Sequence, residues 1–279
     1  MRIAGIVLYN PDIQRLHENI DGIINQVDLV ILIDNGSRNL DEVQIMIKNY
    51  STIELICNNK NMGIARALNQ IGEKAENLKA DWFLTLDQDS VCQSGLISEY
   101  EKVINNPDIA IVTCEIKDRN FDMIEANADK MVYISTCITS GSFMNTAIWK
   151  RLGGFDEKLF IDKVDTDYCF RAIHESYKIA KIHYYGLLHE VGYGTSNKSF
   201  GNIMAFKVFN HSAMRCYYIT RNQIYFARKH SKQLGISRRL RYERTAWTRI
   251  VVYLFYEHNK LEKMKAWIKG LRDGYKMEV

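Results

Sequence analysis

Two acidic side chains, Asp87 and Asp89, stand one residue apart directly after the apolar, β-favouring run at 82–86. A short apolar run bounded by polar residues is typical of a buried strand in a parallel sheet, and ligands of open α/β sheets bind beyond the carboxyl ends of such strands. Neighbouring carboxylates repel each other, and their oxygens suit a hard cation such as Mg²⁺ or Mn²⁺. The pattern therefore predicts a metal site, and the alternative is an ordinary turn rich in Asp and Ser.

Other polar residues follow predicted strands and should lie along the same edge of the sheet. Asn10 and Asp34 each come directly after an apolar run. Nucleotide-binding folds often place an acid at the position of Asp34 to contact a base or ribose, although Asp-Asn-Gly is also a strong turn signal. Asn61 and Gly63 precede a predicted helix whose N-terminus could bind phosphate, with Arg66 as a second contact.

A second group of candidates lies between residues 139 and 167. Three small residues would let a substrate approach the backbone closely: Ser140, Gly141 and Ser142. Three acids crowd the start of a predicted helix: Asp162, Asp165 and Asp167. Favourable interaction with the helix dipole explains one or two of these acids, and a surplus carboxylate near a metal-binding edge is a candidate general base.

The elements that position these residues alternate between strand and helix. Strands are predicted at 3–9, 29–33, 53–57 and 80–86, and helices at 13–24, 40–50 and 64–78. This order predicts a parallel sheet with right-handed crossovers. Beyond residue 90 we expect a helix at 94–105, a strand at 109–116 and a hairpin formed by 121–125 and 131–136. No phosphate-binding glycine motif follows the first strand, which argues against P-loop NTPases and dinucleotide enzymes.

Composition narrows the class of protein further. A chain of 279 residues, 47% of them hydrophobic, is long enough for one large α/β domain with an appendage. Its six cysteines lack C-x-x-C spacing, which favours reduced thiols over disulfides or a zinc site. The N-terminus has no signal-peptide pattern, and no apolar run approaches the roughly 18 residues that span a bilayer, so we expect a cytoplasmic protein.

Charge is distributed unevenly along the chain. Residues 200–279 hold 17 Lys and Arg against 5 Asp and Glu, a net charge of +12, whereas residues 1–199 are acidic. Three helices are predicted in this basic region, and they could lie on an anionic membrane surface at the inner face of the plasma membrane. The alternative is a helical subdomain that packs on the sheet or on another subunit, which leaves a homo-oligomer open. Nucleic-acid binding is disfavoured because no recognition motif is present.

These segments together resemble glycosyltransferase family 2, a group of inverting GT-A enzymes, and within it the bacterial rhamnosyltransferase-like members. The matching segments extend from residue 3 to about residue 225 and are 7–11, 33–37, 61–65, 86–90, 139–142, 153–156, 165–171, 188–190 and 218–222. The resemblance implies a GT-A-type αβα sandwich with a mainly parallel sheet. Its catalytic domain would be residues 1–200, with a nucleotide-binding half at 1–90 and an acceptor half at 91–200, followed by a helical region at 201–279.

The resemblance also implies roles for individual residues at the donor site. Asp34 would contact the nucleotide base, and Asp87 with Asp89 would bind the divalent metal and the ribose or diphosphate. His189 matches the histidine that the family places near the metal, although a structural histidine is the alternative. Arg221 would neutralise the leaving diphosphate.

On the acceptor side, family members often carry a Glu-Asp pair whose Asp deprotonates the acceptor hydroxyl. Here the pair reads Val164-Asp165, so the Asp is kept and the Glu is lost. Asp165 is therefore the predicted base, with Asp162 as the substitute if the register is shifted.

The implied activity is metal-dependent, inverting transfer of a sugar from a nucleotide-sugar donor. The subgroup implies L-rhamnose from dTDP-L-rhamnose, and a glycan or lipid-diphosphate-linked glycan of a bacterial surface polysaccharide as the acceptor. One alternative is a nucleotidyltransferase that makes sugar nucleotides, which would want a Gly-rich, basic loop after the first strand. Another is a non-catalytic module that binds sugar nucleotides or glycans.

Overall fold

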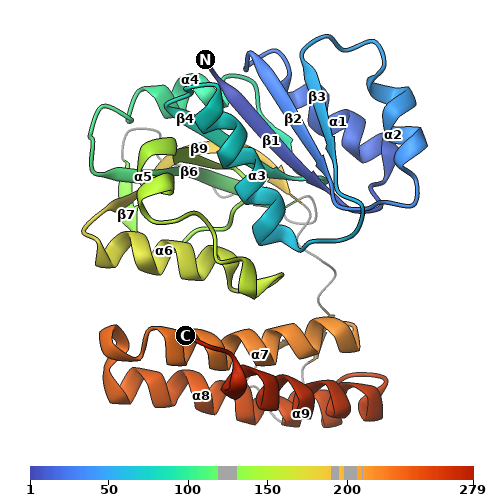
Figure 1. The fold of residues 1–279 in the computed structure, drawn as a ribbon, viewed down its shortest axis with the longest axis vertical. Coiled ribbons are helices and arrows are strands. Elements are labelled where there is room, and N and C mark those ends of the chain that lie inside the picture. Colours follow the sequence, from blue (N-terminus) through green and yellow to red (C-terminus); the bar gives the residue numbers. More distant parts are fainter. Residues whose placement is uncertain (119–130, 190–194, 198–205, 209) are drawn as a thin grey trace. The chain divides into compact units, whose positions relative to one another are not determined.

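The computed structural model describes residues 1–118, 131–189, 195–197, 206–208 and 210–279. The chain forms two compact units (Figure 1). The first comprises residues 1–160 and 164–191, and the second comprises 161–163 and 192–279. The boundary expected at residue 200 falls outside the described residues.

A mixed sheet forms the centre of the first unit. Its strands are β1 (Ile3–Leu8), β2 (Leu29–Asp34), β3 (Ile53–Cys57), β4 (Trp82–Asp87), β5 (Val91–Cys92), β6 (Ile109–Asp118), β7 (Val132–Ile134), β8 (Ser142–Asn145) and β9 (Lys178–His189). Their spatial order is β3-β2-β1-β4-β8-β6-β9-β5, and β7 also pairs with β9. The run β3-β2-β1-β4 is parallel, as is the β6–β9 pair, whereas β8 is antiparallel to both of its neighbours.

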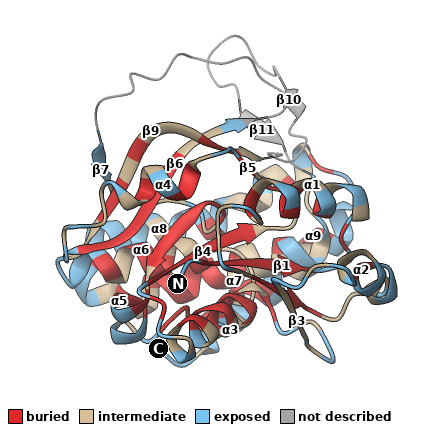
Figure 2. Cartoon of the chain, turned by 90° about the horizontal axis from the view of Figure 1, so that it is seen from above, coloured by how far each residue is buried: buried red, intermediate tan, exposed pale blue. Residues whose placement is uncertain are grey.

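Helices cover both faces of this sheet. They are α1 (Ile13–Ile23), α2 (Leu40–Ile47), α3 (Ile64–Asn77), α4 (Leu96–Glu101), α5 (Thr146–Arg151), α6 (Val164–His174) and a short 3₁₀ helix, η1 (Glu157–Leu159). Side chains alternate across a strand, so β1 directs Ile6 and Leu8 toward α1, α2 and α4, where one large core forms. Gly5 points to the other face, where it leaves room for Ile71 of α3. Both faces of β1 and β4 are therefore buried (Figure 2).

The predicted fold class is confirmed: the protein has an α/β sandwich with a mainly parallel sheet, followed by C-terminal helices. The expected hairpin stays a prediction. The segment predicted at 131–136 contains β7, which pairs with β9. The other predicted arm, 121–125, lies outside the described residues.

The second unit contains α7 (Ala213–Lys229), α8 (Ser231–Phe255), α9 (Lys260–Lys276) and a two-stranded ladder of β10 (Thr195–Asn197) and β11 (Phe206–Val208). Two glycines of α9 let it pack closely on α7: a Cβ at Gly270 would lie 2.8 Å from the Tyr217 carbonyl, and one at Gly274 would lie 2.7 Å from the Arg221 carbonyl. A small apolar core of Ile224, Ala246 and Leu271 joins the three helices. Among the described helices, none is long and apolar enough to cross a membrane.

Candidate active site

The strand register brings several predicted site residues to one edge of the sheet. Leu8 of β1 is paired with Asp34 of β2, and Val7 of β1 is paired with Asp87 of β4. The two acids therefore end the strands that flank β1, and Asn10 follows β1 itself. This carboxyl edge is where open α/β sheets bind their ligands.

The turn that carries Asp87 and Asp89 is held by its backbone. The Asp87 N–H donates to the Ser140 hydroxyl at 3.0 Å, and its carbonyl accepts from the Asn19 amide at 2.7 Å. The hydroxyls of Ser90 and Ser140 lie 2.7 Å apart. Pairing of β4 with β8 thus places the predicted small-residue segment beside the acidic turn. Both carboxylates remain half-buried.

The donor set of this turn fits a hard divalent cation. Asp87 and Asp89 provide carboxylate oxygens at a partly open edge of the sheet, the donors that Mg²⁺ and Mn²⁺ prefer. Among the side chains that the structure describes, no three His, Cys, Asp or Glu cluster in a way suited to a metal. His189 ends β9, but its side chain lies outside the described part, so its role as a ligand stays a prediction.

Asp34 forms the local turn that its Asp-Asn-Gly sequence also predicted. The residue is fully buried, and its carboxylate accepts the N–H groups of Gly36 at 2.9 Å and Ser37 at 3.1 Å. Asn10 ties the end of β1 to this loop, because its side chain accepts the Arg38 N–H at 2.9 Å. Contact between Asp34 and a nucleotide base stays a prediction.

Asn35 connects this loop to the start of α3, a role that the sequence analysis did not assign to it. Its amide donates to the Asn61 side chain at 3.1 Å and to the Gly63 carbonyl at 3.2 Å. Gly63 has a φ of +86°, and a Cβ there would lie 2.8 Å from the Phe160 carbonyl. That carbonyl accepts the N–H of Ile64 at 2.6 Å. One of the N–H groups that the first turn of α3 leaves without a partner inside the helix is therefore hydrogen-bonded to another part of the protein.

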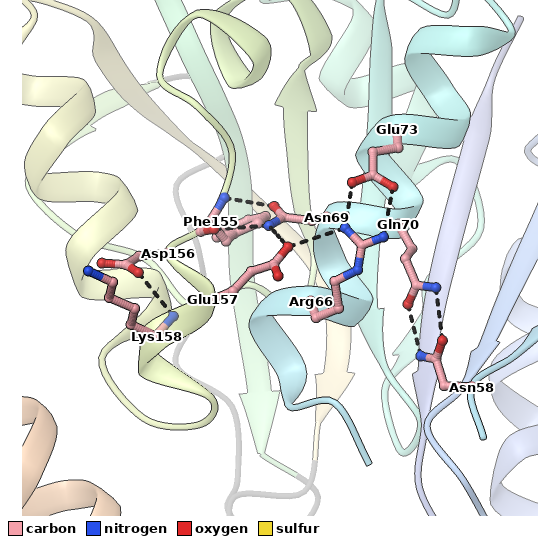
Figure 3. A network of polar contacts seen from close by, with 9 residues as sticks. All are labelled: Asn58, Arg66, Asn69, Gln70, Glu73, Phe155, Asp156, Glu157 and Lys158. Carbon is pink, nitrogen blue, oxygen red and sulfur yellow. Dashed lines mark hydrogen bonds and ion pairs between the residues drawn. The ribbon is translucent and has the colours of Figure 1, made fainter. Parts of the chain in front are cut away.

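Arg66, predicted to contact phosphate, holds α3 to η1 (Figure 3). Its guanidinium pairs with Glu73 at 2.6 Å and with Glu157 at 3.2 Å. Near Arg66, Asn69 bonds to both backbone groups of Phe155: it accepts the N–H at 2.7 Å and donates to the carbonyl at 2.9 Å. The phosphate contact stays a prediction, while the observed contacts fix the approach of η1 to α3.

A small cavity lies at the start of α6. The residues with polar groups that line it are Cys137, Thr139, Ser142, Asp165, Tyr168 and Cys169. Asp165 is half-buried and accepts the Thr166 N–H at 2.6 Å. The two thiols lie 3.7 Å apart, and their mutual hydrogen bond lowers the pKa of Cys169 and raises that of Cys137. The cavity thus brings Asp165 together with Ser142, both predicted to serve the acceptor.

Asp167 faces a different environment from Asp165. Its carboxylate is fully buried and pairs with Arg171 at 2.8 Å. Arg171 also donates to the carbonyls of Leu152 and Gly154, at 2.5 and 2.7 Å. Asp167 therefore positions Arg171, which joins α6 to the preceding loop. Of these two acids, Asp165 is the one that lines the cavity.

Asp162 and Arg221 belong to the second unit. The Asp162 carboxylate pairs with Arg215 at 3.3 Å, and its carbonyl accepts from the Asn222 amide at 3.0 Å. The Arg221 guanidinium lies 4.6 Å from the centre of the Tyr218 ring and donates to the Asn222 side chain at 2.8 Å. The roles predicted for Asp162 at the acceptor and for Arg221 at the diphosphate stay predictions.

The sheet topology, the acidic turn at its carboxyl edge and Asp165 at the cavity agree with the arrangement that the resemblance to a glycosyltransferase implied. The model of the family described as Glycosyl transferase family 2 matches residues 4–173, and the chain belongs to this family. The protein is thus an enzyme, a glycosyltransferase of family 2.

Individual relatives agree with this assignment. The chain is 28% identical over 288 residues to the dTDP-rhamnosyl transferase RfbF of Shigella flexneri, and the alignment covers 97% of this chain and 94% of that protein. Crystal structures of S. aureus TarS 1-349, one of them in complex with UDP-GlcNAc, have a similar fold. Each gives a TM-score of 0.61 at 15% identity and covers 98% of this chain and 80% of TarS 1-349.

Proposed function

We propose that this enzyme transfers L-rhamnose from dTDP-L-rhamnose to a glycan or lipid-diphosphate-linked glycan of a bacterial surface polysaccharide. The observation that carries the donor sugar is the similarity to a dTDP-rhamnosyl transferase over 97% of the chain. A nucleotide-sugar donor is also supported by TarS, a structural neighbour that has been crystallised with UDP-GlcNAc.

The carboxyl edge of the sheet supplies the donor site in this proposal. Asp87 and Asp89 would hold Mg²⁺ or Mn²⁺, which neutralises the charge that develops on the leaving diphosphate. The protein's own contribution is a preformed site: Ser140 and Asn19 fix the acidic turn through its backbone. Because these contacts exist before the donor binds, little ordering remains to be done in the transition state.

Asp165 is the proposed general base. Asp165 lines the small cavity at the start of α6, and in this proposal its carboxylate takes the proton of the acceptor hydroxyl. The deprotonated oxygen attacks the anomeric carbon from the face opposite the leaving group, and this single displacement inverts the anomeric centre. A base of this kind contributes about 10²–10⁴-fold to the rate.

A lipid-linked acceptor would require the enzyme to work at a membrane surface. The net charge of +12 over residues 200–279 supports peripheral contact of the C-terminal unit with the anionic inner face of the plasma membrane.

The donor site is tested with a panel of sugar nucleotides, with and without Mn²⁺. For each one, the shift in the protein's melting temperature and the slow hydrolysis of the nucleotide are measured. We expect dTDP-L-rhamnose to stabilise the wild type only with metal, and Asp87→Ala to lose this effect. Asp81→Ala is the matched control, because Asp81 is an exposed acid just before the other end of the same strand. Stabilisation and hydrolysis with a different donor would overturn the assigned sugar, and metal-independent binding would overturn the assigned role of Asp87.

A further inference from the structure

The outer face of α8 carries an apolar stripe that its own unit leaves uncovered. Five apolar residues and one arginine, spaced three or four apart, form this outward stripe: Ile236, Leu240, Arg244, Trp247, Val251 and Phe255. All six are exposed, Ile236 to 80% and Phe255 to 72%. The opposite face of the helix buries Ala246 and Tyr253 against the unit's interior. The helix is therefore apolar on both faces, and only one of them is used for internal packing.

The outer face of α9 extends this surface. Leu261 and Ile268 are exposed there, interleaved with the basic residues Lys265 and Arg272. The two helices meet where the Trp247 indole N–H donates to the Tyr275 hydroxyl at 3.2 Å. The Trp247 ring also packs edge-on against Trp267, with ring centres 5.6 Å apart. The indole is thus held rigidly while half of its surface stays exposed.

The combination of side chains points to one kind of occupant. Scattered apolar residues are ordinary on a protein surface, but a contiguous apolar face bordered by charge marks an interaction site. Trp and Tyr favour the headgroup level of a bilayer, where one end of the ring is apolar and the other is hydrated. Arg can bury its aliphatic stem and keep its guanidinium at the phosphates. A basic amphipathic helix with these residues lies flat in a membrane interface.

We propose that the outward stripe of α8, together with the outer face of α9, is the surface that docks the enzyme on an anionic phospholipid bilayer. This inference names the site of the peripheral contact proposed above and rests on that proposal. A second copy of the chain is the less favourable occupant, because the region holds 17 basic against 5 acidic residues and would repel itself.

The test is flotation of the full-length protein with vesicles containing phosphatidylglycerol, compared with vesicles of pure phosphatidylcholine. We expect binding to the anionic vesicles and a loss of about tenfold or more in partitioning for the double variant Leu240→Ser/Phe255→Ser. Ile45→Ser is the matched control, since Ile45 of α2 is 74% exposed, close to the 72% of Phe255, but lies outside the surface. The control should bind like the wild type.

Charge is tested in the same assay. Arg244→Gln removes one basic residue from the stripe and should weaken partitioning about fivefold. Lys48→Gln, an exposed lysine at the end of α2, should leave partitioning unchanged.

Three outcomes would overturn the inference. The first is failure of the wild type to bind anionic vesicles, and the second is binding by the stripe variants equal to that of the wild type. The third is a wild-type dimer that the stripe variants fail to form. Donor hydrolysis without vesicles is measured on every variant and should stay at the wild-type level. A wild type that binds vesicles but hydrolyses no donor would instead count against the proposed enzymatic reaction, so the two failures are distinguishable.

Discussion

At the scale of single residues, two acids of α6 show how environment separates structure from chemistry. Asp165 lines a cavity and is half-buried, whereas Asp167 is fully buried and paired with Arg171. A buried, paired carboxylate is already engaged, and using it as a base would break the contacts that join α6 to the neighbouring loop. The accessible carboxylate is therefore the one that can exchange a proton with an acceptor.

Asp165→Asn should lower kcat for sugar transfer by about 10²–10⁴-fold, because the amide cannot take the acceptor proton. Binding of the donor should be unchanged, since the donor site lies on other elements. The measurement is steady-state transfer together with donor affinity from calorimetry. A kcat within a few-fold of the wild type would show that another group is the base.

Asp167→Asn serves as the contrasting variant. It leaves the Arg171 charge without its partner and should lower the free energy of unfolding by about 3 kcal/mol. Urea denaturation measures this loss, which Asp165→Asn should not share. Equal stability losses in the two variants would contradict the structural role given to Asp167.

The sequence predicted the three crowded acids but did not show which of them was surplus. The signal for Asp167 was present, since Arg171 stands four residues later and such pairs meet on a helix. The contact of Asp162 with Arg215, 53 residues away, had no comparable local signal. Side-chain partners across that distance depend on tertiary packing.

At the scale of elements, α3 organises the loop that leads to η1. Asn69 pairs with the Phe155 backbone much as a neighbouring strand would. The preceding residue, Gly154, fits beside Asn69 because it lacks a Cβ, which would lie 2.6 Å from the Asn69 side-chain oxygen. Pattern alone predicted the helix and its buried face. It could not predict this clamp, because Asn69 and Phe155 are 86 residues apart.

Asn69→Ala should destabilise the protein by about 1–3 kcal/mol, because it leaves the buried N–H and carbonyl of Phe155 unpaired. Gln70→Ala is the control on the same helix, since Gln70 pairs only with the partly buried side chain of Asn58 (2.9 Å) among the contacts drawn in Figure 3. Its loss should be smaller than about 1 kcal/mol. Urea denaturation compares the two, and an equal effect would show that Asn69 does not clamp the loop.

The carboxyl edge itself was predictable from strand order, because parallel strands bring their ends together. The ion pair of Arg66 with Glu157 was not predictable, because Glu157 comes from η1, far along the chain. A basic residue near a helix N-terminus is consistent with phosphate binding and with an ion pair alike, and only the folded structure shows which carboxylates are within reach.

At the scale of the whole molecule, charge and apolar surface would make separate contributions to the proposed membrane binding. The C-terminal region carries a net charge of +12, and the remainder of the chain is acidic. In the proposed contact, attraction to anionic lipid would therefore be local to the C-terminal unit. An apolar stripe is needed to hold the protein once the charges have brought it to the surface.

These two contributions should separate with ionic strength. The Debye length falls from about 10 Å at 0.1 M salt to about 3 Å at 1 M, so the attraction of Arg244 and its basic neighbours is screened. Apolar burial is not screened, and the wild type should therefore retain weak binding in 1 M NaCl. The Leu240→Ser/Phe255→Ser variant should lose that residual binding, whereas Arg244→Gln should match the wild type there and differ only at low salt. Flotation across a salt series measures this, and complete release of the wild type at 1 M would show that charge alone carries the contact.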